Sequence, residues 1–304
     1  MVGGRVFAFL REVIDEWQRD AALTLGAALA YYTMFAMAPL LVLVIAVAGL
    51  VLGRAAAQGE IVAQISGLMG ADSAKMIEDM IVRASSPASG ITATLISIGT
   101  MTLGASGVFG QLQSSLNSIF GGEPRYGTGI RGMLLQRLLA FGMIIAIGFL
   151  LLVSLVLSAV VAGLHEYLQM RAPVLVDVLP TLNFALSFVV VTGLFAIIYK
   201  VLPDVRLAWR DVWLGAVVTA LLFTVGKSVI GFCLGRAGTT SVYGAAGSLV
   251  LVLLWIYYSA QILFLGAEFT EVYSRRYGSR PDAPRERPAE PEATRNVPVD
   301  PPVL

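Results

Sequence analysis

The chain has 304 residues, of which 57% are hydrophobic and 13% are charged, and its mean hydropathy is +0.79. Soluble domains carry about 25% charged residues, so this composition excludes an ordinary soluble enzyme and indicates a membrane protein. The net charge of +1 gives no basic field for nucleic acid, and a single histidine with a single cysteine cannot supply a zinc site of three or four such ligands.

The first segment, residues 5–19, is predicted to form an amphipathic helix. Its apolar side chains recur at the spacing of one helix face: Val6, Phe7, Leu10, Val13, Ile14 and Trp17. We expect the helix to lie flat on the membrane surface, or alternatively to pack on the protein's own loops. Because charges of both signs alternate through it, we do not expect a signal peptide here.

Six stretches are long and apolar enough to cross a hydrocarbon core of about 30 Å as helices. They are predicted at residues 27–52, 91–120, 138–163, 178–202, 212–234 and 245–270. The first contains Pro39, which removes a backbone hydrogen bond and therefore predicts a kink; a gating hinge is the more specific alternative. Residues 54–90 are too polar to span, and they predict two short amphipathic helices separated by Gly70. We therefore expect an all-α, six-helix transmembrane domain over residues 1–276.

The second span carries a row of small residues that recurs every four positions: Thr102, Ser106, Gly110, Ser114 and Ser118. Such a ridge lets another helix approach closely, which is our preferred interpretation. Gln113 and Asn117 border the same face, so the wall of a polar cavity is the alternative.

The last span carries a stripe at helical spacing: Leu254, Tyr257, Gln261, Phe264 and Glu268. Unpaired polar groups are costly in hydrocarbon, so we expect this stripe to turn inward, with Tyr257, Gln261 and Glu268 as candidate cavity contacts. The alternative places Glu268 at the water interface. Lys227, in the fifth span, is expected to face an inner cavity and attract the anionic group of a lipid or metabolite, or else to snorkel to the interface.

Residues 277–304 are rich in proline and mixed charge, and they predict a disordered cytoplasmic tail. Fifteen of the 21 Lys and Arg residues fall on the side of the predicted topology that holds both termini, and five fall on the other. This bias predicts that both termini are cytoplasmic.

Three segments together resemble one family: Tyr31–Val44 (YYTMFAMAPLLVLV), Val201–Val218 (VLPDVRLAWRDVWLGAVV) and Tyr243–Tyr273, and Asn117 fits as well. They are similar to the YihY/BrkB-type proteins, over roughly Arg11–Arg276. The resemblance implies six membrane helices and a location in the bacterial inner (plasma) membrane, but no settled activity. An older name for such proteins is ribonuclease BN.

Ribonuclease activity is disfavoured, because metal-dependent hydrolysis needs clustered ligands and the acidic residues here are scattered. No P-loop sequence is present for ATP use, and we expect no cofactor, no metal and no enzymatic activity. Two functions remain. The chain is a passive or ion-coupled transporter, or flippase-like protein, for an anionic or amphiphilic envelope substrate, or it is a scaffold that organises envelope machinery. We expect membrane lipids as partners and no nucleic acid.

Overall fold

The computed structural model describes residues 2–85, 107–122, 179–236 and 245–281, with isolated residues between 132 and 161. Regular structure in these ranges is helical throughout, which confirms the all-α prediction for the described part of the chain. The helices are α1 (Val2–Arg19), α2 (Ala22–Leu52), α3 (Arg54–Met69), α4 (Ala71–Ser85), α8 (Leu179–Val201), α9 (Trp209–Arg236) and α11 (Ala245–Arg276). Residues 107–120 form a further helix.

Three described helices are long and apolar enough to cross a membrane: Leu179–Val201, Trp209–Ile230 and Gly247–Arg276. A fourth span results if Gly4–Arg19 and Ala22–Ala38, which meet at 58°, are counted together. The predicted span 138–163 and the first part of 91–120 lie largely outside the described residues, so the number six stays a prediction. Pro39 lies inside α2, which is helical from Ala22 to Leu52, and the hinge also stays a prediction.

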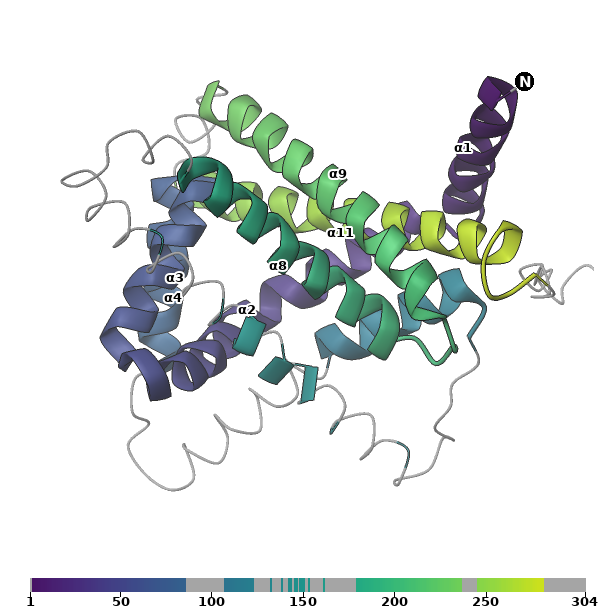
Figure 1. Ribbon diagram of the computed structural model, residues 1–304. Helices are drawn as coiled ribbons and strands as arrows, with labels where there is room; N and C mark the ends of the chain where they lie inside the picture. Colours follow the sequence, from purple (N-terminus) through teal and green to yellow (C-terminus); the bar gives the residue numbers. More distant parts are fainter. Residues whose placement is uncertain are drawn as a thin grey trace, which may run out of the picture.

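The polar segment after the first span forms two short helices, as predicted. Gly70 separates α3 from α4 with a φ of 86°, a left-handed conformation that glycine adopts without steric cost. Ile77 and Ile81 of α4 are buried in one cluster with Ile45 of α2 and Val252 of α11. The two helices therefore fold back onto the body, at the opposite end of α11 from α1 (Figure 1).

Helices α9 and α11 interlock through two glycines and two threonines. A Cβ at Gly215 of α9 would lie 1.7 Å from Thr270 Oγ1 of α11, and a Cβ at Gly266 of α11 would lie 1.9 Å from Thr219 Oγ1 of α9. Each threonine thus occupies the space that the opposite glycine leaves free, which brings the two backbones close together. From α8, the hydroxyl of Tyr199 donates to the carbonyl oxygen of Leu263 at 2.7 Å and ties the third helix to this pair.

Within the described residues, the small-residue ridge of the second span makes no close contact, and its packing on another span stays a prediction. Ser114 and Ser118 are exposed, and a Cβ at Gly110 would meet no atom of the described residues within 4 Å. Ser106 lies outside the described residues. The helix instead buries the face that carries its large apolar side chains, including Leu116 and Phe120, because burial of large side chains removes more apolar area from water.

The ordered body extends past residue 276, where we predicted the disordered tail to begin. The backbone N–H and the hydroxyl of Ser279 donate to Asp211 Oδ2 at 2.8 and 2.7 Å. Arg280 Nη1 donates to the carbonyl oxygen of Phe120 at 2.8 Å. Residues 277–281 therefore pack on the body, while residues 282–304 lie outside the described part.

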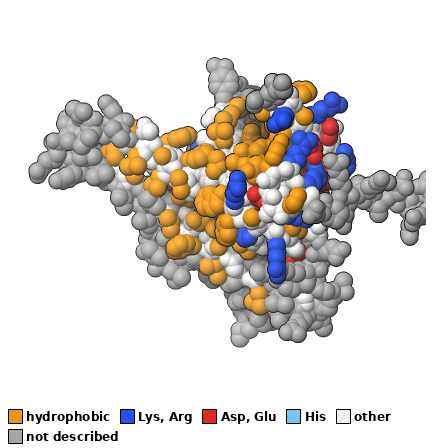
Figure 2. Space-filling view, turned by 45° about the vertical axis from the view of Figure 1, so that its right-hand side comes forward, with side chains coloured by type: hydrophobic (Ala, Val, Ile, Leu, Met, Phe, Trp, Pro, Cys, Tyr) orange, Lys and Arg blue, Asp and Glu red, His pale blue; other side chains and the backbone are white. Residues whose placement is uncertain are grey.

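Hydrophobic side chains cover much of the described surface in Figure 2, and charged side chains gather toward the side where α1 and the end of α11 lie. The exposed apolar residues include Leu214, Val217, Leu221 and Val225 of α9. Such a surface suits contact with lipid.

Candidate functional site

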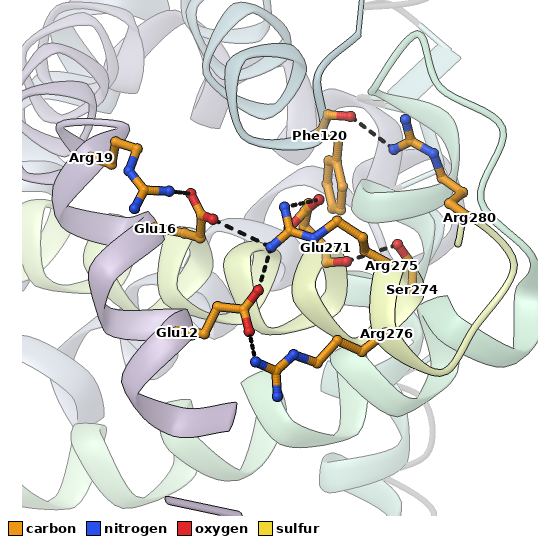
Figure 3. Close-up of polar contacts among 9 residues, drawn as sticks. All are labelled: Glu12, Glu16, Arg19, Phe120, Glu271, Ser274, Arg275, Arg276 and Arg280. Atoms are coloured by element: carbon orange, nitrogen blue, oxygen red, sulfur yellow. Dashed lines mark hydrogen bonds and ion pairs between the residues drawn. The ribbon is translucent and has the colours of Figure 1, made fainter. Parts of the chain in front are cut away.

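The polar side chains of α1 and α11 meet around one arginine, Arg275 (Figure 3). Its Nη2 atom lies 2.7 Å from Glu12 Oε1 and 3.3 Å from Glu16 Oε1, and its Nη1 atom lies 3.3 Å from Glu271 Oε1. Glu12 and Glu16 share one face of α1 because they are four residues apart, and Glu271 and Arg275 share one face of α11 for the same reason. We call these four residues the Arg275 cluster.

The Arg275 cluster is largely buried. The Arg275 side chain is 12% exposed, and the three carboxylate side chains are between 10% and 14% exposed. Arg276 pairs with Glu12 Oε2 at the rim, and Arg19 Nη1 lies 2.6 Å from Glu16 Oε2. The forked guanidinium of Arg275 can donate to several carboxylates at once, which suits it to this position better than lysine.

A second acidic pair lies beside this cluster, at the turn between α1 and α2. Ala21 adopts a left-handed conformation with a φ of 51°, and the turn places Asp20 near Glu268 of α11, close enough for their charges to interact. Glu268 is 1% exposed, and its Oε1 atom has no hydrogen-bond partner among the described residues. Burial, and then the negative charge of Glu16, raise the pKa of Asp20 to about 6.

The inward orientation predicted for the stripe of α11 holds from Tyr257 onward. Gln261 Nε2 donates to the carbonyl oxygen of Ala22 at 3.3 Å. A Cβ at Gly26 would lie 2.0 Å from that nitrogen and 3.6 Å from the ring of Tyr257, so Gly26 leaves the space that both side chains use. Leu254 is the exception at 47% exposed, because it belongs to the apolar outer face of α11 together with Leu253. Glu268 is buried, and its depth relative to the water interface stays a prediction.

Gln113 and Asn117 belong to a different polar group. Both side-chain amides donate to Asp204 Oδ2, at 3.1 and 2.9 Å, and Asn117 Oδ1 accepts from the backbone N–H of Asp204 at 2.7 Å. Asp204 lies in the connection between α8 and α9. The two residues therefore fix this connection, instead of joining Glu268 in one cavity.

Lys227 is exposed on the outer side of α9, beside the exposed Val225 and Val229. Its neighbour Gly226 is the residue that faces α11, since a Cβ there would lie 2.3 Å from the hydroxyl of Tyr258. One residue corresponds to a rotation of about 100° around a helix, which turns Lys227 away from the interior. The inner-cavity position and the alternative of snorkelling to the interface both remain predictions.

The sequence interpretation missed Asp20, Arg275 and the two α1 glutamates. Their signal was the spacing of Glu12, Glu16 and Asp20, which recur every four residues and form one acidic stripe. Within the described ranges, no group of three His, Cys, Asp or Glu residues is arranged to hold a metal ion.

Comparison with known proteins matches residues 13–291 to the family described as virulence factor BrkB. A UPF0761 membrane protein of Ralstonia nicotianae is 34% identical over 157 residues, which cover 51% of this chain and 34% of that protein. A UPF0761 membrane protein of Yersinia pestis is 34% identical over 146 residues, which cover 45% of this chain and 48% of that protein. The matched stretch thus spans less than half of either relative. No solved structure matches.

Proposed function

We propose that this chain, which belongs to the BrkB family of membrane proteins, is a transporter for an anionic, amphiphilic constituent of the bacterial envelope. The observation that carries this proposal is Glu268, a carboxyl group that is 1% exposed inside a helix apolar enough to span a membrane. Ionisable groups at such positions are costly, and a helix that served only as an anchor would not need one.

The surroundings of Glu268 suit an amphiphile. Gln261 and Tyr257 follow it along the inward face of α11, so polar contacts continue from Glu268 along the helix. Arg19 and Arg276 lie at the outer edge of the same region, 51% and 35% exposed at their side chains, and they would attract an anionic head group. The hydrocarbon part of the substrate would lie in the lipid, along the exposed apolar surface of α9.

The proposal places the protein in the bacterial inner membrane, with the α1 end and the Arg275 cluster on the cytoplasmic side. The excess of Lys and Arg on the predicted side of both termini supports this orientation.

Proteoliposomes carrying a fluorescent anionic lipid test the proposal, because dithionite bleaches only the outer leaflet. The wild type is expected to expose inner-leaflet label faster than protein-free vesicles. Glu268→Gln should reduce this rate at least tenfold, since the variant removes the carboxyl with almost no change in shape. Asp15→Asn is the matched control, because Asp15 is an acid on α1 whose side chain is 54% exposed. A wild-type rate equal to that of empty vesicles, across zwitterionic and anionic lipids, would refute transport of this class.

A scaffold is the second candidate, and one observation favours it. Val6, Phe7, Leu10 and Ile14 of α1 are between 44% and 70% exposed, and they form an apolar face that no described residue covers. A partner protein in the membrane would fit this face. Absence of flux together with co-purification of one envelope protein, lost on Leu10→Ser, would support the scaffold over the transporter.

A further inference from the structure

We propose that the connection between α8 and α9 is a binding site for the head group of an anionic phospholipid. The site is formed by three basic side chains and two tryptophan rings, which we call the α8–α9 site: Lys200, Arg206, Trp209, Arg210 and Trp213. The proposal does not depend on transport, because a lipid held at this position would bind whether or not the protein moves another molecule.

The backbone of this connection is fixed by its two acidic residues. Asp204 accepts hydrogen bonds from two side-chain amides of the helix at residues 107–120, and Asp211 accepts from the backbone and hydroxyl of Ser279. The hydroxyl oxygen of Ser279 in turn accepts from the backbone N–H of Ala208 at 3.3 Å. Both carboxylates are thus engaged by donors of the protein itself, and a frame that is fixed in advance lowers the entropic cost of binding a ligand.

The charge that the connection presents to its surroundings is positive. Of the charged residues from Lys200 to Asp211, the two that are exposed are Arg206 and Arg210, and neither forms an ion pair with a described residue. Lys200 is held at the same place, because its Nζ atom donates to a backbone carbonyl of the connection and lies 5.4 Å from the centroid of the Trp209 ring. Two unpaired guanidiniums beside this ammonium group suit the phosphate of a head group.

The neighbouring chain end does not cancel this charge. Arg280, which follows the serine bound to Asp211, adds another guanidinium beside the connection. Glu271 of α11 is bound by Arg275 within the Arg275 cluster. A lipid phosphate at the α8–α9 site would therefore meet exposed cations and engaged carboxylates.

The apolar surface next to these cations identifies the ligand as a lipid. Trp209 and Trp213 are four residues apart on one face of α9, and they are 52% and 46% exposed. Tryptophan is favoured at membrane interfaces because its ring has an apolar body and a polar N–H. From Trp213, exposed apolar side chains recur every four residues at Val217, Leu221 and Val225. An acyl chain along this row would place its head group at the arginines, whereas a free phosphate ion would leave the row uncovered.

The α8–α9 site lies at the boundary of the hydrocarbon core. The apolar stretch of α8 that is long enough to span a membrane ends at Val201, and that of α9 begins at Trp209. Figure 1 shows the connection at the same end of the molecule as α1 and the last turns of α11. Arg19 and Arg276, the candidate contacts of the transported substrate, belong to α1 and α11 and are not part of this site.

Competition between lipids tests the proposal with the full-length protein in vesicles. Phosphatidylcholine with brominated acyl chains quenches tryptophan fluorescence on contact, and most of the signal comes from Trp209 and Trp213, since Trp255 is 6% exposed and Trp17 is half-buried. Unlabelled phosphatidylglycerol should relieve the quenching about threefold more effectively than unlabelled phosphatidylcholine, because each basic residue near an anionic head group strengthens binding. Added salt should weaken this preference by screening the charges.

Variants of the two exposed arginines leave all four tryptophans in place. Arg206→Gln combined with Arg210→Gln should abolish the preference for phosphatidylglycerol, and Arg206→Glu combined with Arg210→Glu should reverse it. Arg54→Gln combined with Arg83→Gln is the matched control, because these are exposed arginines of α3 and α4, at the other end of the molecule, and this pair should keep the preference.

Equal competition by the two lipids in the wild type would overturn the proposal. A preference that survives in both folded variants of Arg206 and Arg210 would overturn it as well. Inorganic phosphate at matched ionic strength should leave the preference unchanged. If free phosphate removed the preference, the site would bind an ion and not a lipid, and the proposal would fail.

Discussion

The Arg275 cluster allows a quantitative test of the fold, in which Arg275 is replaced by methionine. The substitution keeps most of the aliphatic stem and removes the guanidinium that lies 2.7 to 3.3 Å from three carboxylates. Removing one partner of a buried ion pair costs about 3–5 kcal/mol, because the remaining charge is left without compensation. Since the Arg275 side chain keeps 12% exposure, and Arg276 and Arg19 still contact two of the carboxylates, we expect the lower end, about 3 kcal/mol.

The assay is reversible unfolding in detergent micelles, followed by circular dichroism, with Arg11→Met as the control. Arg11 is an arginine of α1. Its only described ion pair is with Asp15 at 3.9 Å, and both side chains are more than half exposed. An exposed pair of this kind contributes about 0–1 kcal/mol. The loss of unfolding free energy in Arg275→Met should become smaller at low pH, because protonation of the carboxylates removes the repulsion among them. Equal losses in the two variants, or a deficit that does not change with pH, would contradict the burial argument.

Three further predictions concern packing, the chain end and topology. Gly215→Ala should destabilise the protein by about 1–3 kcal/mol, since its Cβ would meet a threonine at 1.7 Å, whereas Gly110→Ala should be neutral or slightly stabilising in the same unfolding assay. A chain ending after Gly278 should melt at a lower temperature than one ending after Pro281, because it leaves the buried Asp211 carboxylate without the serine that binds it. In intact cells, an impermeant thiol reagent should label Ala71→Cys but not Pro281→Cys, both in a chain without its native cysteine; the opposite pattern would invert the orientation.

Elements whose signal is local could be predicted from the sequence. The α3–α4 pair follows from two short apolar repeats and the break at Gly70, and the ends of α8 fall within one residue of the predicted 178–202. The inward turn of α11 was also predictable, because Gln261 and Glu268 could not stay unpaired in lipid. These features depend on periodicity and on the cost of burying single groups, both of which a sequence displays directly.

The partners of those groups could not be predicted, because they depend on how distant segments meet. Glu268 was recognised as a candidate, but its proximity to Asp20 depends on the bend at Ala21, and no glycine or proline marks this bend in the sequence. Close packing was assigned to the ridge at Gly110 because small residues recur there. Among the described residues, a tight contact lies at Gly215 and Gly266, where each glycine needs a threonine on the opposite helix, and a single helix does not reveal that pairing.

The contact between Glu12 and Arg275 also sets an order of events during synthesis. The two residues are 263 positions apart, so at about 5–20 residues per second the ribosome needs roughly 13–53 s to make the arginine after the glutamate. Throughout that interval the acidic stripe of the nascent α1 has no guanidinium from α11 to bind. A chain that stalls or is cut before its last helix therefore presents uncompensated acid beside the bilayer, which distinguishes it from a finished molecule. We expect membrane quality-control proteases to recognise an interrupted chain by this difference.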